Sequence, residues 1–152
     1  MSRPIKRIEH IGIAVNDLDS SISFYRDILG LKLIGIETVE SEQVRVAFIE
    51  IGETKIELLE ASSSESSIAR FIEKKGEGIH HIAFQTENSQ QHLDLLKKQG
   101  IKLINETPKE GAHGNLIAFL HPKSTNNVLM ELCQPASEKS REEVVKSNEH
   151  CL

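Results

Sequence analysis

An internal repeat restricts the fold of this chain more than any other feature of its 152 residues. Residues 8–34 and 79–104 share one pattern, in which a β-branched run carrying a histidine leads to a Gly-Leu/Ile-Lys-Leu-Ile segment. Each copy later places a glutamate inside an apolar strand, as Ile56-Glu57-Leu58-Leu59 and as Leu129-Met130-Glu131-Leu132. Such self-similarity indicates two equivalent modules. Aligning the copies places His10 on His81 and Glu57 on Glu131.

Hydrophobic periodicity predicts the order β-α-β-β-β in both copies. We expect strands near 7–15, 31–39, 44–51, 54–60, 79–86, 101–106, 115–120 and 127–134. A helix should precede Gly30, which can end it in a left-handed conformation, and a second helix should cover 88–98. We therefore expect an α+β fold.

The chain is expected to form a single domain over 1–135. Its two βαβββ modules would cover 5–60 and 79–134, and the linker 61–78 would begin with a serine-rich stretch and contain a short helix around 66–75. The tail 136–152 is polar and charged, and carries no chemistry that its residue types reveal.

Composition narrows the class of partner. The formal net charge of −5 argues against nucleic acid or an anionic membrane surface as the main partner. The sequence contains no run of about 18 apolar residues and no signal-peptide pattern at its start. Its two cysteines do not form a CxxC pair. We expect a cytoplasmic protein with reduced thiols.

Each repeated histidine has small neighbours on its own face of a strand. Residues two apart in a strand share a face, so His10 lies with Gly12 and Ala14, and His81 lies with Ala83. Small side chains leave room for a ligand beside each imidazole. His80 should face the other side of its strand and be structural, whereas His113 lies in a glycine-containing loop that could touch a ligand.

The matched glutamates point to a metal ion. A carboxylate buried in an apolar strand is costly unless it is paired or binds a cation, and one lone strand histidine is more often structural than a ligand. The repeat of both residue types favours one divalent metal held by His10, Glu57, His81 and Glu131. Nitrogen and oxygen donors suit Zn²⁺, Co²⁺, Mn²⁺, Ni²⁺ or Fe²⁺ and do not distinguish among them. Such an ion could act as a Lewis acid for proton abstraction beside a carbonyl, or for attack on a chelated diol.

The chain resembles the vicinal oxygen chelate (glyoxalase/bleomycin resistance/dioxygenase) superfamily, and within it the methylmalonyl-CoA epimerases. The stretches that carry this resemblance are His10-Ile-Gly-Ile-Ala-Val, Phe24-Tyr-Arg-Asp-Ile-Leu-Gly-Leu, Val44-Arg-Val-Ala-Phe, Glu57-Leu-Leu-Glu, Gly76-Glu-Gly-Ile-His-His-Ile-Ala, Phe119-Leu-His-Pro-Lys-Ser and Val128-Leu-Met-Glu-Leu. The resemblance implies the glyoxalase-like fold, in which the two modules form a curled mixed sheet around a metal cleft. It also implies that the same four residues bind the metal.

The resemblance further implies an acyl-CoA substrate, with a proton removed from C2 on one face and returned on the other through an enolate. Two acid/base groups are needed for this reaction. The family places a catalytic glutamate just before the Val-Arg-Val-Ala-Phe strand, where this chain has Glu40-Ser41-Glu42. We expect Glu42 to be that group, with Glu40 as the alternative, and Glu131 to be the second. Lys109, Lys123 and His113 are candidates for contacts with CoA, and none of them is assigned.

The main alternative is a lactoylglutathione lyase (glyoxalase I), or another metal-dependent member of the superfamily. The lyase would need paired arginines for glutathione, and only Arg45 lies in a strand near the expected site. An extradiol dioxygenase would leave Glu57 without a role, and a metal-free binding protein of this fold lacks the ligand set. A homodimer is expected, because sheet edges and an apolar face need cover.

Overall fold

The computed structural model describes residues 5–136, so the polar tail predicted over 136–152 lies outside the described residues except for its first position. The chain divides into two compact units. The N-terminal unit comprises Arg7–Ala83, and the C-terminal unit comprises the chain from Phe84 onward together with the residues before Arg7. The module bounds of 5–60 and 79–134 stay a prediction.

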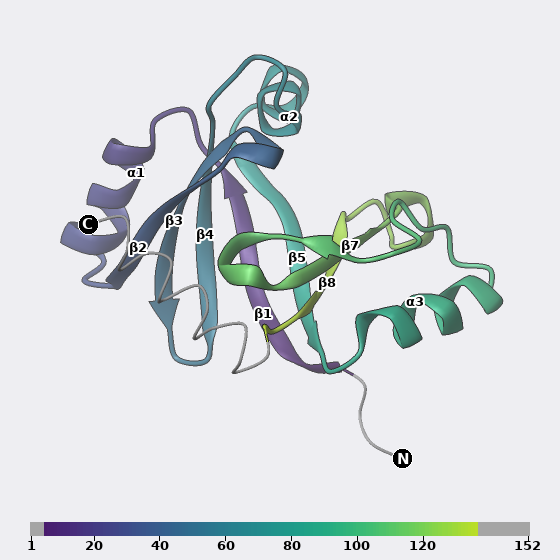
Figure 1. Cartoon of the computed structure of the whole chain (residues 1–152). Helices are drawn as coiled ribbons and strands as arrows, with labels where there is room; N and C mark the ends of the chain where they lie inside the picture. Colours follow the sequence, from purple (N-terminus) through teal and green to yellow (C-terminus); the bar gives the residue numbers. More distant parts are fainter. Residues whose placement is uncertain (1–4, 137–152) are drawn as a thin grey trace. The chain divides into compact units, whose positions relative to one another are not determined.

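The N-terminal unit carries two α-helices and all or most of five strands (Figure 1); the first two residues of the first strand and the last three of the fifth belong to the C-terminal unit. Its elements are β1 (Ile5–Ala14), α1 (Leu18–Ser23), a π-helix (Phe24–Ile28), β2 (Lys32–Val39), a 3-10 turn (Glu40–Glu42), β3 (Val44–Ile51), β4 (Thr54–Ala61), α2 (Ser67–Lys75) and β5 (Gly78–Thr86). Neighbouring strands follow the order β2-β3-β4-β1-β5. β1 pairs with β4 in parallel, and β3 pairs with β2 and β4 antiparallel.

Helix α1 covers one face of these strands. Asp17 caps it by accepting a hydrogen bond from the Ser20 amide at 2.9 Å. Leu18 and Ile22 then pack into a buried cluster with residues of β3 and β4: Ala47, Ile49 and Leu58. The expected helix does not run unbroken to Gly30, because its last part widens into the π-helix. Packing against α1 leaves the opposite face of β1 and β4 for other side chains.

The C-terminal unit contains α3 (Ser89–Lys98), β6 (Lys109–Glu110), a 3-10 turn (Ala112–Gly114), β7 (Leu116–Leu120), a second 3-10 turn (Pro122–Ser124) and β8 (Met130–Gln134). β7 lies between β8 and β6, and both pairings are antiparallel. Asn88 caps α3 through the Gln91 amide at 3.0 Å. The buried core of this unit contains Leu93, Ala118, Leu120 and Leu132.

The prediction of a strand at 101–106 is wrong. An isolated bridge between Leu103 and Leu120 is what forms there. Backbone bonds join this segment to β7 and the residue after it, from the Ile104 amide to the Phe119 carbonyl and from the His121 amide to the Lys102 carbonyl, both at 2.9 Å. Side chains add to them, since Asn105 Oδ1 accepts the Phe119 amide at 2.8 Å and Ser124 Oγ accepts the Lys102 amide at 2.9 Å. The strand that does pair with β7 on this side is the short β6.

Within residues 5–136, no helix has the length and hydrophobicity that crossing a membrane requires.

Candidate metal centre

His10 and His81 lie together in the N-terminal unit, as the repeat predicted. Both are buried, at 4% and 5% exposure. Their Nε2 atoms are 3.0 Å apart, and the rings meet edge to face. Two nitrogens bound to one ion at about 2.0–2.1 Å, at roughly a right angle, are separated by about 3 Å. The histidine pair therefore has the spacing of two adjacent ligands on one metal ion.

Gly12 makes room for this pair. A Cβ atom at Gly12 would lie 2.6 Å from Nδ1 and 2.8 Å from Nε2 of His81, and closer still to Cε1. Real Cβ atoms do not approach other atoms so closely. The small residue two places after His10, which the sequence marked as space for a ligand, is thus the space that the second imidazole occupies.

Glu57 reaches His10 through the other ring nitrogen. Its Oε2 lies 2.8 Å from Nδ1 of His10, whereas Nε2 faces His81. A carboxylate at Nδ1 favours the tautomer with the proton on that nitrogen, which directs the Nε2 lone pair toward a metal. The structure brings Glu57 to the predicted cluster in an orienting position. Its role as a direct ligand stays a prediction.

Glu9 is a site residue that the sequence reasoning missed. It is 5% exposed, and Oε1 lies 3.1 Å from Nδ1 of His10 while Nζ of Lys55 donates to both carboxylate oxygens at 3.0 and 3.2 Å. Burial alone would raise its pKa. The hydrogen bonds of His10 and Lys55 and the charge of Lys55 outweigh burial and lower the pKa of Glu9 to about 2. The available signal was a carboxylate directly before His10 in an otherwise apolar run.

His81 is held neutral by its surroundings. Burial, followed by the neighbouring His10 and His80, lowers the pKa of His81 well below its usual value. A metal binds the neutral imidazole, so the environment favours the ligating form at neutral pH. His80 contributes directly, since its Nδ1 lies 2.9 Å from Nδ1 of His81. A proton on Nδ1 of His81 would leave Nε2 as the ligand atom.

His80 itself is fixed by packing. Its ring meets Phe71 of α2 edge to face, with centroids 5.1 Å apart. Burial and the charge of Lys75 lower its pKa to about 4, so His80 is neutral at neutral pH. The structural role expected for His80 therefore includes holding the ring of a predicted ligand.

Glu131 lies in the C-terminal unit, on β8. It is 3% exposed and stands opposite Phe119 in the pairing of β7 with β8, between Met130 and Leu132. The prediction of a carboxylate buried among apolar strand residues is confirmed. Its roles as metal ligand and as acid/base group stay predictions.

The two candidates for the first acid/base group lie on the 3-10 turn between β2 and β3. Glu40 is exposed and Glu42 is half-buried. Gln43 then takes a left-handed conformation with φ of 54°, which returns the chain into β3. The last paired residues of the hairpin are Val39 and Val44, so both glutamates lie beyond the end of the ladder.

Comparisons with known proteins agree with this architecture. The family described as the Glyoxalase/Bleomycin resistance protein/Dioxygenase superfamily matches residues 9–119. The mitochondrial methylmalonyl-CoA epimerase of Mus musculus is 40% identical, over 84% of this chain and 72% of its own length. The ethylmalonyl-CoA/methylmalonyl-CoA epimerase of Cereibacter sphaeroides is 41% identical, over 86% of this chain and 98% of its own length.

A solved structure shows the same fold. A variant of the Streptomyces coelicolor methylmalonyl-CoA epimerase, in complex with 2-nitronate-propionyl-CoA, has a TM-score of 0.84 and 36% identity, covering 88% of this chain and 96% of that one. The predicted glyoxalase-like fold is confirmed. The chain belongs to the Glyoxalase/Bleomycin resistance protein/Dioxygenase superfamily.

Proposed function

We propose that this chain is a methylmalonyl-CoA epimerase, which interconverts the (R) and (S) forms of its substrate by moving the proton at C2. The observation that carries the proposal is the buried pair of His10 and His81, with Nε2 atoms 3.0 Å apart, in a chain that is 40% and 41% identical to two named epimerases. We therefore propose that this chain acts on the substrate named for those relatives, methylmalonyl-CoA.

A divalent metal fits the donor set of this centre. His10 and His81 would hold it through Nε2, and we propose Glu57 and Glu131 as the carboxylate ligands. When bound, such an ion supplies a Lewis acid that lowers the energy of negative charge on the thioester oxygen. Cobalt, zinc, manganese and nickel all suit these donors.

The chain's own residues prepare the centre. Glu9 and Glu57 hold Nδ1 of His10, and Lys55 neutralises the carboxylate of Glu9. His80 fixes the ring of His81. These contacts set the orientation and tautomer of both rings before any ion binds. To serve as a ligand as well, Glu57 would have to turn a carboxylate oxygen from Nδ1 of His10 toward the ion.

Proton transfer at C2 needs one acid/base group on each side of the carbon. We propose Glu131 for one side, from the repeat and the family resemblance. On the other side, Glu42 is the residue that the resemblance favours and Glu40 its alternative. In either direction a carboxylate takes the proton, an enolate forms, and the opposite acid returns a proton.

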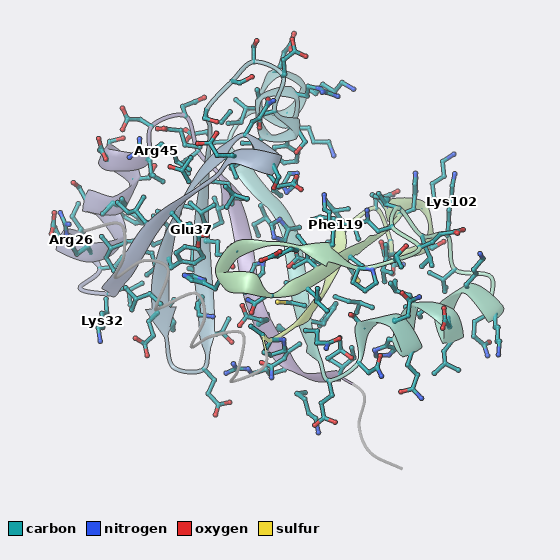
Figure 2. The ribbon with its side chains drawn as sticks, in the orientation of Figure 1. Arg26, Lys32, Glu37, Arg45, Lys102 and Phe119 are labelled. Atoms are coloured by element: carbon teal, nitrogen blue, oxygen red, sulfur yellow. The ribbon has the colours of Figure 1, made fainter. Side chains whose placement is uncertain are left out.

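Arg45, the arginine that a lactoylglutathione lyase would use to bind glutathione, is engaged in an ion pair. Nη1 of Arg45 binds Glu60 Oε1 at 3.2 Å, and Glu60 Oε2 accepts the Leu18 amide at 2.7 Å (Figure 2 labels Arg45). These two bonds tie Arg45 of β3, through Glu60, to the start of α1. An anion-binding role for Arg45 would have to break its bond with Glu60.

Proton NMR of the metal-loaded protein with methylmalonyl-CoA in D₂O tests the proposal. We expect rapid loss of the C2 proton signal with no net chemical change. Absence of exchange, with the metal shown to be bound, would refute the epimerase. A parallel assay with the hemithioacetal of methylglyoxal and glutathione would then show whether the lyase alternative holds.

We also propose that the protein acts as a homodimer. Apolar side chains of the π-helix region are exposed, with Phe24 at 46%, Ile28 at 74% and Leu29 at 52%. Light scattering coupled to size exclusion would test this, and a monomer at micromolar concentration would refute it. The cytoplasmic location stays a prediction from the sequence.

A further inference from the structure

Strand β2 contains a β-bulge that changes which of its residues face which side. Leu33 pairs with Ile49 of β3, but Gly35 pairs with the next residue, Phe48, so two steps on β2 match one on β3. Without this shift, Gly35 and Glu37, two and four residues on, would share the face of Leu33, which packs into the cluster under α1. The bulge therefore turns the second half of β2 to the other face.

That other face carries the metal centre. Phe48 is the partner of Glu57 on β4, and Glu57 is in turn the partner of Gly12 on β1. Directly paired residues share a face, and so do residues two apart along a strand. Gly12 is two residues from His10. The face of Phe48 is thus the face of His10 and Glu57.

Glu37 is brought to this face by the bulge. It pairs with Val46, and Val46 pairs with Leu59, which is two residues from Glu57 on β4. Two strand spacings, about 10 Å in all, separate the backbone of Glu37 from that of β4. The side chains of Val46 and Leu59 lie between them on the same face, so Glu37 stands on the edge strand of the face that carries His10 and Glu57. Figure 2 labels Glu37 on its strand.

The placement of Glu37 on this inner face, with Ile36 on the outer face, is not the placement that hydrophobic burial favours. Its paired neighbours Val46 and Leu59 are 3% and 5% exposed, and one carboxylate oxygen of Glu37 is shielded from solvent. The adjacent Ile36, on the opposite face, is 46% exposed. A one-residue slip of β2 would exchange the two, with the apolar side chain inside. Local choices that oppose packing are concentrated at functional sites.

We propose that Glu37 is one of the two acid/base groups, in the role that the family resemblance would give to Glu42. This role rests on the proposed epimerase function. In one direction the Glu37 carboxylate takes the C2 proton, so the C–H bond breaks, an O–H bond forms and the electron pair enters the enolate. The acid on the other side then protonates C2 with inverted configuration. Glu37 afterwards returns its proton to water, and the group on the other side takes one from water, which restores both for the next turnover. In the reverse direction Glu37 is the acid.

The test compares Glu37→Gln with Glu42→Gln in the metal-loaded protein. Each epimer of methylmalonyl-CoA is supplied separately in D₂O. Loss of the C2 proton is followed by NMR, and inversion by a coupled enzyme that consumes one epimer only. Metal content is measured by mass spectrometry for every variant. The amide of Gln keeps the size of Glu but cannot carry the proton.

We expect Glu37→Gln to retain its metal and to slow inversion by on the order of 10²–10⁴-fold, the usual contribution of one general base. One epimer should still exchange its C2 proton with retained configuration, because the group on the opposite side remains. A defect in folding or in metal binding would slow both epimers alike, so this split identifies an acid/base role. Glu50→Gln is the control: this carboxylate is exposed near the end of β3, opposite Lys32, and its variant should stay within a few-fold of the wild-type rate. A larger loss in Glu42→Gln than in Glu37→Gln would overturn the assignment of Glu37.

The outcomes separate the two proposals. Wild-type protein that binds metal but exchanges neither epimer overturns the epimerase and, with it, this role of Glu37. If the wild-type protein exchanges and Glu37→Gln does so equally, the role of Glu37 alone is overturned. Metal loss in Glu37→Gln would overturn it as well. Glu37→Asp, which keeps a carboxylate on a shorter chain, should recover part of the inversion rate.

Discussion

The contact between Gly12 and His81 predicts that one added methyl group will damage the metal centre. Gly12 is not among the glycines with positive φ, so its backbone accepts alanine without strain. The effect of Gly12→Ala is therefore steric. The new Cβ would lie 2.6 Å from Nδ1 of His81 and closer still to Cε1, and ordinary contact needs about 3.4 Å, so the imidazole must move by at least about 0.8 Å.

The magnitude follows from what a metal site tolerates. Ligand distances in such sites stay within about 0.2 Å of their preferred values, so a shift near 0.8 Å removes His81 as an effective ligand. Loss of an outer-shell partner already costs roughly 10- to 100-fold in affinity, and a displaced ligand should therefore cost on the order of 100-fold or more. Overpacking should lower the free energy of unfolding by about 1–3 kcal/mol, partly offset by the stiffer unfolded chain.

Calorimetric titration of metal-stripped protein with Co²⁺ or Zn²⁺ measures the affinity, and urea unfolding measures the stability. Gly35→Ala is a matched control, because it also lies in a strand with no positive φ and no atom of the described residues lies within 4 Å of its added Cβ. We expect the control to bind metal like the wild type. A Gly12→Ala protein that binds metal as tightly as the control would refute the steric reasoning.

Three further perturbations test the surroundings of the centre. Glu131→Ala should lose metal and turnover together, and near-normal values of both would contradict its assignment as a ligand. The fold holds the pKa of Glu9 at about 2 instead of 4.5, so the ionised carboxylate contributes on the order of 3 kcal/mol above pH 4.5, and this contribution disappears as the pH falls toward 2. Metal-free Lys55→Met should therefore have a lower free energy of unfolding than the wild type at pH 7, and its free energy of unfolding should fall less between pH 4.5 and pH 2. If its urea midpoint equals that of the wild type at both ends of this range, the ion pair of Lys55 with Glu9 does not stabilise the fold. Asn105→Ala should cost about 1–2 kcal/mol, because the Phe119 amide loses its acceptor, and unchanged or slower hydrogen exchange at that amide would contradict this.

The repeat made the ligand positions visible without any structure. Strand periodicity and residue type are local properties, so the alignment of His10 with His81 already placed both imidazoles in equivalent strands. The cap at Asp17 and the glutamates in apolar strands were readable for the same reason. The family followed from these motifs, and the fold followed from the family.

Contacts between strands decided the rest. The register of β1, β4 and β5 determines that Glu57 contacts Nδ1 of His10. The same register places Gly12 against the ring of His81. The segment expected as a strand at 101–106 is held to β7 by a few backbone bonds and by the side chain of Asn105, without a continuous ladder.

Glu37 shows most clearly what the sequence alone does not determine, which is the face of the sheet on which a strand residue lies. Alternation along β2 is readable in the sequence, but the face on which each residue lies depends on the pairing with β3. One extra residue in that ladder reverses the facing of everything after it. Sequence alone thus determined which residues could do the chemistry, and the tertiary structure decided on which face of the sheet each of them lies. The physical reason is that register is fixed by the hydrogen bonds between paired strands and not by the residues of one strand alone.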